Sequence, residues 1–255
     1  MELGLKGKIA LVTGTASQVG IGKAVALTLA KEGCQIISCD IDIAGAEKTA
    51  AEVRALKQKA VAFKVDVTDR NQVNEMVQKG LKEFGRIDIL AGIAGGSAFS
   101  GPLVEAKLEA IDKEINLNLI GAINCTKAVL PVMIEHKYGK IILISSDAAF
   151  FGVPGGSGYS AAKAGVMAFT RSIAREVGLS GINVNNISPG LVITNFYGGE
   201  GAPMLPPQLR KSAENPLGKM TTTQDIANML VFLASDVSGN ITGQCFVVDG
   251  GQIMD

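Results

Sequence analysis

Short apolar runs alternate with longer segments of helical periodicity along nearly the whole chain of 255 residues. The short runs have the length of buried strands, and the longer segments repeat their apolar positions every three to four residues, as amphipathic helices do. The pattern predicts strands at Lys8–Thr13, Gln35–Cys39, Ala60–Val65, Ile87–Ala91, Lys140–Ser145, Asn183–Ser188 and Gln244–Val248. It predicts helices at Ile21–Glu32, Ala44–Leu56, Asn71–Phe84, Leu108–His136, Ser157–Gly178 and Thr223–Ala234.

Strands that alternate with helices of this length are typical of βαβ crossovers, which produce a parallel sheet. We therefore expect a single α/β domain over residues 1–255, a doubly wound, Rossmann-like parallel sheet of six to seven strands with helices on both faces. The one long segment without either pattern, at about residues 190–215, contains three prolines and predicts a flap beside a binding site.

Composition narrows the class of protein. Hydrophobic residues make up 47% of the chain, which is enough for a large core. Lysine plus arginine and aspartate plus glutamate number 24 each, and this balance argues against nucleic acid or an anionic membrane as the main partner. The N-terminal residues lead directly into a strand rather than a signal peptide, and no uninterrupted apolar stretch reaches the roughly 18 residues of a membrane span.

Cysteine and histidine usage narrows the chemistry further. The four cysteines are scattered and the chain has a single histidine, His136, so we expect neither a metal site nor a Ser-His-Asp triad. Scattered, unpaired thiols favour a cytoplasmic protein. His136 is expected near a helix C-terminus, where the helix dipole favours a positive charge.

A tyrosine and a lysine that share one helix face are the strongest sign of catalysis. Tyr159 and Lys163 are four residues apart, so their side chains leave the helix on the same side. An ammonium group beside a phenol lowers the phenol's pKa, which lets the tyrosine exchange a proton near neutral pH. Ser146 follows an apolar strand and could donate a hydrogen bond to the same reacting oxygen. Tyr-x-x-x-Lys alone also fits an ordinary surface pair, so its meaning depends on the rest of the chain.

A glycine-rich turn after the first strand predicts a nucleotide site. Gly14, Gly20 and Gly22 lie between that strand and the next helix, where backbone N–H groups can bind a pyrophosphate. Asp40 follows the second strand, where a carboxylate binds the ribose hydroxyls of NAD and repels the additional phosphate of NADP. The turn holds no lysine or arginine, and none follows Asp40 within several residues, so NAD is the expected cofactor. Asp66 follows the third strand, where it could cap the helix Asn71–Phe84, reach the adenine, or do both.

Further motifs complete an ordered set. In chain order the set is Thr13-Gly14 with Gly20-Ile21-Gly22, Asp66, Asn118-Leu119-Ile120-Gly121, Ser146, Tyr159-x-x-x-Lys163, Pro189-Gly190 with Thr194, and Asp249-Gly250-Gly251. Each motif is common by itself, whereas the ordered set is specific. With these motifs the chain resembles the short-chain dehydrogenase/reductase family over essentially its whole length. The resemblance implies an NAD-dependent alcohol dehydrogenase or ketone reductase.

The resemblance also implies roles for the residues. Tyr159 would be the general acid/base, Ser146 would polarise the substrate oxygen, and Lys163 would hold the nicotinamide ribose and lower the pKa of Tyr159. Asn118 would position a water that relays protons to Lys163. The residues expected to bind the cofactor are Gly14, Ser17, Gly20, Ile21, Gly22, Asp40, Asp66, Val67, Ala94, Gly95, Tyr159, Lys163, Pro189, Gly190, Val192 and Thr194.

Two segments depart from the family's pattern. Five residues separate Gly14 from Gly20 where the family usually has three, which leaves the phosphate contacts open among Thr15, Ala16, Ser17 and Val19. The stretch Gly92–Gly96 stands where the family usually has Asn-Asn-Ala-Gly, so the contacts of two amide side chains must be replaced by other groups.

The expected partner is a small, largely apolar secondary alcohol or ketone. Mainly apolar side chains follow the motifs that should surround the substrate: Phe99, Phe150, Phe151, Val153, Phe196, Tyr197, Met204 and Leu205. They either line the pocket or pack the flap, and Asp147 could instead face the substrate and select a polar group. The resemblance implies a homotetramer.

Two other functions remain open. A 3-oxoacyl thioester reductase would normally prefer NADPH, which Asp40 disfavours. A nucleotide-binding pseudoenzyme with a structural or regulatory role is supported by the altered Gly92–Gly96 stretch and by the long glycine-rich turn. The complete set of expected catalytic residues argues against the pseudoenzyme.

Overall fold

Seven parallel strands form one sheet in the computed structural model, which describes residues 2–97, 101–192, 194 and 215–254. The strand order is β3-β2-β1-β4-β5-β6-β7, so the chain starts at the middle of the sheet and builds it outward first on one side and then on the other. The doubly wound parallel fold is therefore confirmed. The strands are β1 (Ile9–Thr13), β2 (Gln35–Asp40), β3 (Ala60–Lys64), β4 (Ile89–Gly92), β5 (Gly139–Ile144), β6 (Ile182–Pro189) and β7 (Cys245–Val248).

Alternate residues of each central strand supply opposite cores. In β1, Ala10 and Val12 belong to the core on one face of the sheet, and Ile9 and Leu11 belong to the core on the other. This alternation follows from the two-residue repeat of a strand. Both faces are apolar because both are covered by helices, which explains why the strands read as continuous apolar runs.

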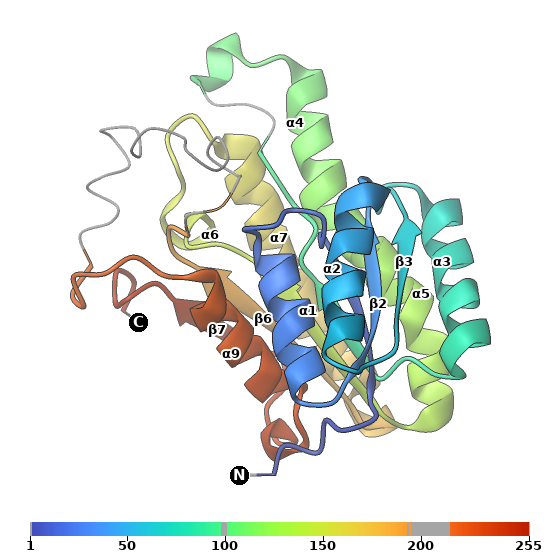
Figure 1. Ribbon diagram of the computed structural model, residues 1–255. Helices are drawn as coiled ribbons and strands as arrows, with labels where there is room; N and C mark the ends of the chain where they lie inside the picture. Colours follow the sequence, from blue (N-terminus) through green and yellow to red (C-terminus); the bar gives the residue numbers. More distant parts are fainter. Residues whose placement is uncertain (1, 98–100, 193, 195–214, 255) are drawn as a thin grey trace.

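Two sets of helices cover the two faces (Figure 1). One set is α1 (Ile21–Lys31), α2 (Ile43–Ala55) and α9 (Thr223–Ala234). The other set is α3 (Arg70–Phe84), α5 (Gly121–His136) and α7 (Ser157–Val177). Local signals fix where several of them begin, because Asp42 and Asp69 cap α2 and α3, and Thr222 forms a capping box with Asp225 at the start of α9.

The predicted helix Leu108–His136 is divided. It consists of α4 (Leu108–Ile115), one π-helical turn over Asn116–Ile120, and α5. Such single π turns occur frequently at functional sites, and this one contains Asn118. Among the described residues this is the one helical stretch long and apolar enough to cross a membrane. Its apolar character is explained by the core, since Cys125, Val129 and Met133 are buried against the sheet.

Candidate active site

Most of the predicted site residues lie at the carboxyl edge of the sheet. Parallel strands end there together, so loops from distant parts of the chain meet. Thr13, the last residue of β1, accepts hydrogen bonds from the N–H groups of Ile93 and Ala94, both at 2.9 Å. The threonine hydroxyl thus holds the backbone of the turn after β4.

Tyr159 and Lys163 share a face of α7, as their spacing predicted. The Nζ of Lys163 lies 5.6 Å from the centroid of the Tyr159 ring and donates a 2.9 Å hydrogen bond to the carbonyl of Ile144. Lys163 is buried, and burial lowers the pKa of its ammonium to about 8. No carboxylate forms an ion pair with it among the described residues. A buried lysine without an ion partner is costly for the fold and is therefore a sign of function.

Ser146 lies directly after β5, on the same side of the sheet edge. Its neighbour Ser145 donates a 2.9 Å hydrogen bond to the carbonyl of Lys163, which ties the end of β5 to α7. The Oγ of Ser146 donates to Oδ1 of Asp147 at 2.9 Å and accepts from the N–H of Ala148 at 3.2 Å. Asp147 begins the short helix α6 (Ala148–Phe151), which the sequence did not predict.

Asn118 holds the loop after β4. Its Oδ1 accepts from the N–H of Gly96 at 3.1 Å, and its Nδ2 donates to the carbonyls of Gly96 and Glu114 at 2.7 and 2.9 Å. The amide group thus fixes the backbone of Gly96. A methyl group on Gly95 would lie 2.7 Å from Oδ1 of Asn118 and 3.2 Å from Nζ of Lys163. Gly95 is therefore packed between these two side chains, and no larger residue fits without moving them.

A buried carboxylate near this loop was not found by sequence reasoning. Glu114 of α4 accepts a 2.7 Å hydrogen bond from the hydroxyl of Ser97. Its other oxygen packs against Gly158, the residue before Tyr159, where a methyl group would lie only 2.5 Å away. Glu114 thus connects the loop after β4 to the first turn of α7. The sequence signal is weak, because a glutamate in an amphipathic helix is normally exposed.

The glycine-rich turn contains polar residues that bond within the fold and others that have hydrogen-bonding groups to spare. Thr15 is buried, with its hydroxyl 2.8 Å from that of Ser38. The Oγ of Ser17 is buried and has no hydrogen-bond partner within the described part of the chain. A methyl group on Gly20 would lie 3.0 Å from that Oγ. An unused buried hydroxyl beside a bare glycine backbone fits an anionic phosphate, so among the residues of the lengthened turn Ser17 is the candidate for this contact.

Asp40 ends β2 and points to this turn. Its Oδ2 accepts a 2.9 Å hydrogen bond from the N–H of Ala16, and its Oδ1 accepts one of 3.1 Å from the N–H of Asp42. A carboxylate has about four acceptor positions, so two remain for ribose hydroxyls. The residues present thus fit a dinucleotide, with Ser17 at a phosphate and Asp40 at the adenosine ribose.

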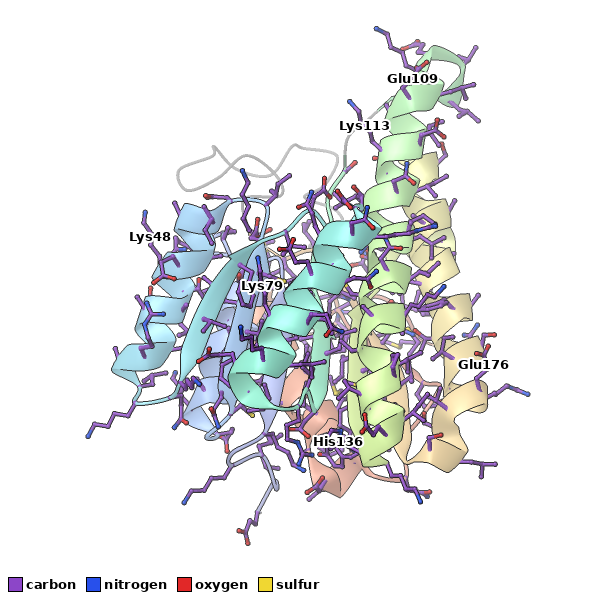
Figure 2. All side chains as sticks on the ribbon, turned by 90° about the vertical axis from the view of Figure 1, so that its right-hand side faces the viewer. Lys48, Lys79, Glu109, Lys113, His136 and Glu176 are labelled. Atoms are coloured by element: carbon purple, nitrogen blue, oxygen red, sulfur yellow. The ribbon has the colours of Figure 1, made fainter. Side chains whose placement is uncertain are left out.

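A groove of about 360 Å³ runs beside the turn and contains a residue that the sequence did not indicate. Lys48 lines it from α2, eight positions after Asp40 (Figure 2). Lys48 is in the second turn of α2, which places it beside the glycine-rich turn although it is not adjacent to Asp40 in the sequence. The groove is lined by Ala16, Ser17, Gln18, Val19, Asp42, Ala44, Gly45 and Lys48.

Asp66 does not cap α3, so that alternative is wrong. Its Oδ1 instead accepts from the N–H and hydroxyl of Thr68, at 2.9 and 2.7 Å. The cap is Asp69, which accepts from the N–H groups of Asn71 and Gln72 and directly precedes the helix, three positions after Asp66. Asp66 is left at the end of β3, followed by Val67, whose carbonyl accepts from Asn124 at 3.0 Å.

The segment after β6 closes the site's other side. Pro189 accepts from the N–H of Asp147 at 3.0 Å, the N–H of Gly190 donates to Val248 at 3.0 Å, and Val192 forms a parallel bridge with Thr221. Thr194 is half-buried. Most of the expected flap, residues 193 and 195–214, lies outside the described residues, as do the candidate pocket residues Phe99, Phe196, Tyr197, Met204 and Leu205. Phe151, by contrast, is described and is 54% exposed.

His136 takes no part in the site. It ends α5 at the opposite edge of the sheet, with Nδ1 2.8 Å from the carbonyl of Val132 (Figure 2). Within the described ranges, no three histidine, cysteine, aspartate or glutamate side chains are grouped as metal ligands.

Comparisons with known proteins agree with this architecture. The family model described as "Enoyl-(Acyl carrier protein) reductase" matches residues 14–252. The chain is 38% identical over 252 residues to a 3-oxoacyl-(acyl-carrier-protein) reductase of Thermotoga maritima, covering 98% of this chain and 99% of the relative. It is 36% identical over 269 residues to a cyclohexanol dehydrogenase of Rhodococcus sp., covering 98% and 97%.

A solved structure adds a cofactor to the comparison. Carveol dehydrogenase from Mycobacterium avium, solved in complex with NAD, superposes with a TM-score of 0.89 at 29% identity, over 98% of each chain. The family match covers nearly the whole chain, and the relatives are matched over nearly their whole length. The chain belongs to the short-chain dehydrogenase/reductase family of oxidoreductases, which use nicotinamide cofactors.

Proposed function

We propose that this protein is an NAD-dependent oxidoreductase that interconverts a secondary alcohol and its ketone. The observation that carries the proposal is the buried Lys163, placed beside Tyr159 at the same sheet edge as Ser146. This group can hold a substrate oxygen and exchange a proton with it. A bound nicotinamide cofactor supplies the hydride acceptor for oxidation and the hydride donor for reduction.

The chain's own residues have three tasks in this reaction. Tyr159 takes the hydroxyl proton of the alcohol, or returns it to the ketone oxygen. Ser146 donates a hydrogen bond to the same oxygen, for which its single hydroxyl proton turns away from Oδ1 of Asp147. Lys163 lies behind Tyr159, and its charge favours the deprotonated phenol. Its buried position reduces screening by water, which strengthens that influence.

The choice of NAD rests on Asp40, whose carboxylate lies at the ribose end of the site and would repel an additional phosphate. Carveol dehydrogenase, a protein similar to this chain, was solved with NAD. Lys48 favours NADP instead, since its side chain lines the groove beside Ser17 and its ammonium would attract the additional phosphate. We expect Asp40 to prevail because it is held in place by two backbone N–H groups, whereas Lys48 is on a flexible stem.

The second candidate function is reduction of a 3-oxoacyl thioester. It is favoured by the similarity to the Thermotoga reductase and by the description of the matching family model. A cyclohexanol dehydrogenase is nearly as similar, at 36% against 38% identity, so identity does not decide between the two chemistries. Asp40 favours the alcohol dehydrogenase. The pseudoenzyme hypothesis is weakened by the geometry of the Tyr159–Lys163 pair.

Assembly, substrate polarity and location belong to the proposal as well. We propose a homotetramer in the cytoplasm that acts on a largely apolar substrate. Exposed apolar side chains support an assembly, since Val104 and Leu108 near the start of α4 are 92% and 71% exposed. Light scattering of the purified protein tests the tetramer, for which the expected mass is four times 26.4 kDa.

The deciding experiment assays a panel of alicyclic alcohols, their ketones and a 3-oxoacyl thioester with NAD(H) and NADP(H). Turnover of an alcohol or ketone with a preference for NAD(H) is the expected result. Turnover of the thioester alone, with NADPH, would establish the second candidate. Binding of a cofactor without turnover of any compound would favour the pseudoenzyme.

A further inference from the structure

The carboxylate of Asp147 touches the group that should hold the reacting oxygen. Its Oδ1 accepts the hydroxyl of Ser146 at 2.9 Å and the N–H of Ala148 at 2.7 Å. Its own N–H donates to Pro189, so the backbone of Asp147 is fixed between β5 and the end of β6. The position of the carboxylate relative to Ser146 is thus set by three hydrogen bonds.

The second oxygen of this carboxylate is not used by the fold. Within the described residues, neither a hydrogen bond nor an ion pair reaches Oδ2 of Asp147. Burial raises the pKa of Asp147 above its usual value, hydrogen bonds from Ser146 and Ala148 lower it, and the charge of Asp249 raises it. A half-buried carboxylate without a cation gains most from a ligand that donates a hydrogen bond.

We infer that Asp147 is a specificity residue that binds a second hydroxyl group of the substrate, on the carbon beside the reacting carbon. The preferred substrates are therefore vicinal diols and 2-hydroxyketones on an otherwise apolar frame. This inference rests on the proposed function, because it takes Ser146 as the residue that binds the reacting oxygen.

The geometry explains the position of the second hydroxyl. Ser146 has one hydroxyl proton, which Oδ1 of Asp147 accepts in this structure at 2.9 Å. When that proton turns to a reacting oxygen, the oxygen lies one hydrogen bond from Oγ and therefore beside the Asp147 carboxylate. Oδ2 is bonded to the same carbon as Oδ1, so a donor on the adjacent carbon of the substrate can reach it. The second hydroxyl is bound and not consumed, and the oxidation of the first proceeds as proposed above.

Asp147 also caps α6, and this structural role must be separated from binding. Aspartate, asparagine and serine cap helices about equally well, so substitutions among them preserve the cap. Asp147→Asn keeps one acceptor oxygen and replaces the charged Oδ2 by an amide nitrogen. Asp147→Ser removes that atom altogether. The matched control is Asp236→Asn, a remote aspartate that accepts from Tyr138 at the opposite edge of the sheet.

The test compares kcat/KM for both isomers of 1,2-cyclohexanediol with kcat/KM for cyclohexanol. In the wild type we expect the better diol isomer to be preferred by about 10- to 100-fold, the range of a charge-assisted hydrogen bond. The preference should fall to a few-fold in Asp147→Asn and to about one in Asp147→Ser, and remain at the wild-type value in Asp236→Asn. Equal ratios in all four proteins would overturn the inference.

A binding measurement separates this inference from the proposed function. The same alcohols are titrated by calorimetry into Tyr159→Phe saturated with NAD, with and without Asp147→Ser. One outcome is that Tyr159→Phe binds the diol more tightly than cyclohexanol, that Asp147→Ser abolishes this preference, and that the wild type oxidises none of the alcohols. That outcome overturns the proposed function and supports the role of Asp147. Oxidation of the alcohols without any diol preference in rate or binding overturns the role of Asp147 alone.

Discussion

The two edges of the sheet carry similar polar side chains, but these side chains have different hydrogen-bond and charge partners. At the amino edge, Tyr138 donates to Asp236 at 2.9 Å, and its ring is covered by the ammonium of Lys8 at 3.6 Å. At the carboxyl edge, Tyr159 lies beside Lys163, which is buried and has no carboxylate partner in the described structure. Each edge thus combines a tyrosine with a lysine, and at the amino edge Asp236 accepts from the tyrosine, whereas within the described residues no carboxylate pairs with Lys163.

The amino edge is a closed network. Asp88 is buried, and its two oxygens accept from the N–H of Ile9 at 2.9 Å and from Nε of Arg86 at 2.7 Å. A hollow of about 530 Å³ also lies at this edge and is lined by Lys6, Lys31 and Lys59 among others. None of the predicted catalytic residues lines it, so this hollow is not the predicted active site.

The carboxyl edge instead leaves polar groups incomplete. The hydroxyl of Ser17, the ammonium of Lys163 and Oδ2 of Asp147 all lack a full set of partners within the described residues. Unsatisfied groups destabilise the fold, so three of them among the predicted site residues are a physical sign of ligand binding. Buried oxygens without a partner in the described structure also occur in α5 at Thr126 and in β6 at Asn186, so the sign is useful only together with the residue types.

The largest expected effect comes from removing the hydroxyl of Tyr159. Tyr159→Phe keeps the ring beside Lys163 and removes the proton donor, so kcat/KM should fall by about 1000-fold, within the range of general acid–base catalysis. The measurement is the absorbance of NADH during oxidation of the best alcohol in the panel. A variant that retains wild-type turnover would show that another group handles the proton.

The second prediction concerns the cost of burying Lys163 in the cofactor-free protein. Its pKa falls from 10.5 to about 8, which corresponds to about 3 kcal/mol of stability lost at pH 7. Lys163→Met removes this cost together with one hydrogen bond worth about 1 kcal/mol, so the free energy of unfolding should rise by about 2 kcal/mol at pH 7. Urea denaturation measures the difference.

The pH dependence of that difference has a definite sign. Between about pH 8 and pH 10.5 the unfolded state still binds the lysine proton and the folded state does not, so the wild type becomes more stable as pH rises. The advantage of Lys163→Met is therefore full below pH 8 and shrinks toward pH 10.5. Lys79→Met on the exposed face of α3 is the control and should show neither effect (Figure 2). An advantage that stays constant with pH would contradict the explanation by burial.

Local sequence patterns predicted the helices and strands. The features that the sequence did not predict depend on contacts between residues far apart in the chain. The strands fall within one or two residues of prediction, because buried parallel strands are marked by their own apolar residues. The pairing of Tyr159 with Lys163 was predictable for a similar reason, since four residues along a helix fix it.

Other features depend on parts of the chain that are far apart. The hydroxyl of Thr13 bonds to residues 80 and 81 positions later, and no window of sequence contains both ends. Lys48 joins the nucleotide groove only because α2 packs beside the glycine-rich turn, where Gly45 contacts Ala16. Asp66 and Asp69 are both reasonable helix caps in the sequence, and the backbone path after β3 decides between them.

The third prediction tests which carboxylate selects the cofactor. Asp40→Asn removes the charge and keeps an acceptor for the N–H of Ala16, so the turn should remain folded. The ratio of kcat/KM for NAD to that for NADP should fall by about tenfold, since the repulsion of the additional phosphate is lost while Lys48 remains. Asp236→Asn at the amino edge should leave the ratio unchanged. The same ratio in both variants would mean that the ribose is recognised elsewhere.

The smallest expected effect comes from the tyrosine at the other edge. Tyr138→Phe removes the hydroxyl that donates to Asp236 and leaves the ring under Lys8, so it should lower the free energy of unfolding by about 1 kcal/mol. Burial raises the pKa of Tyr138, as the Asp236 carboxylate also does, so its hydroxyl stays protonated and serves only as a donor. The turnover of Tyr138→Phe, measured in the same assay as that of Tyr159→Phe, should equal the wild-type rate. A fall in turnover of about fivefold, which is the rate equivalent of about 1 kcal/mol, would show that the two edges are coupled. The hydrogen-bond network at the amino edge would then contribute to catalysis as well as to stability.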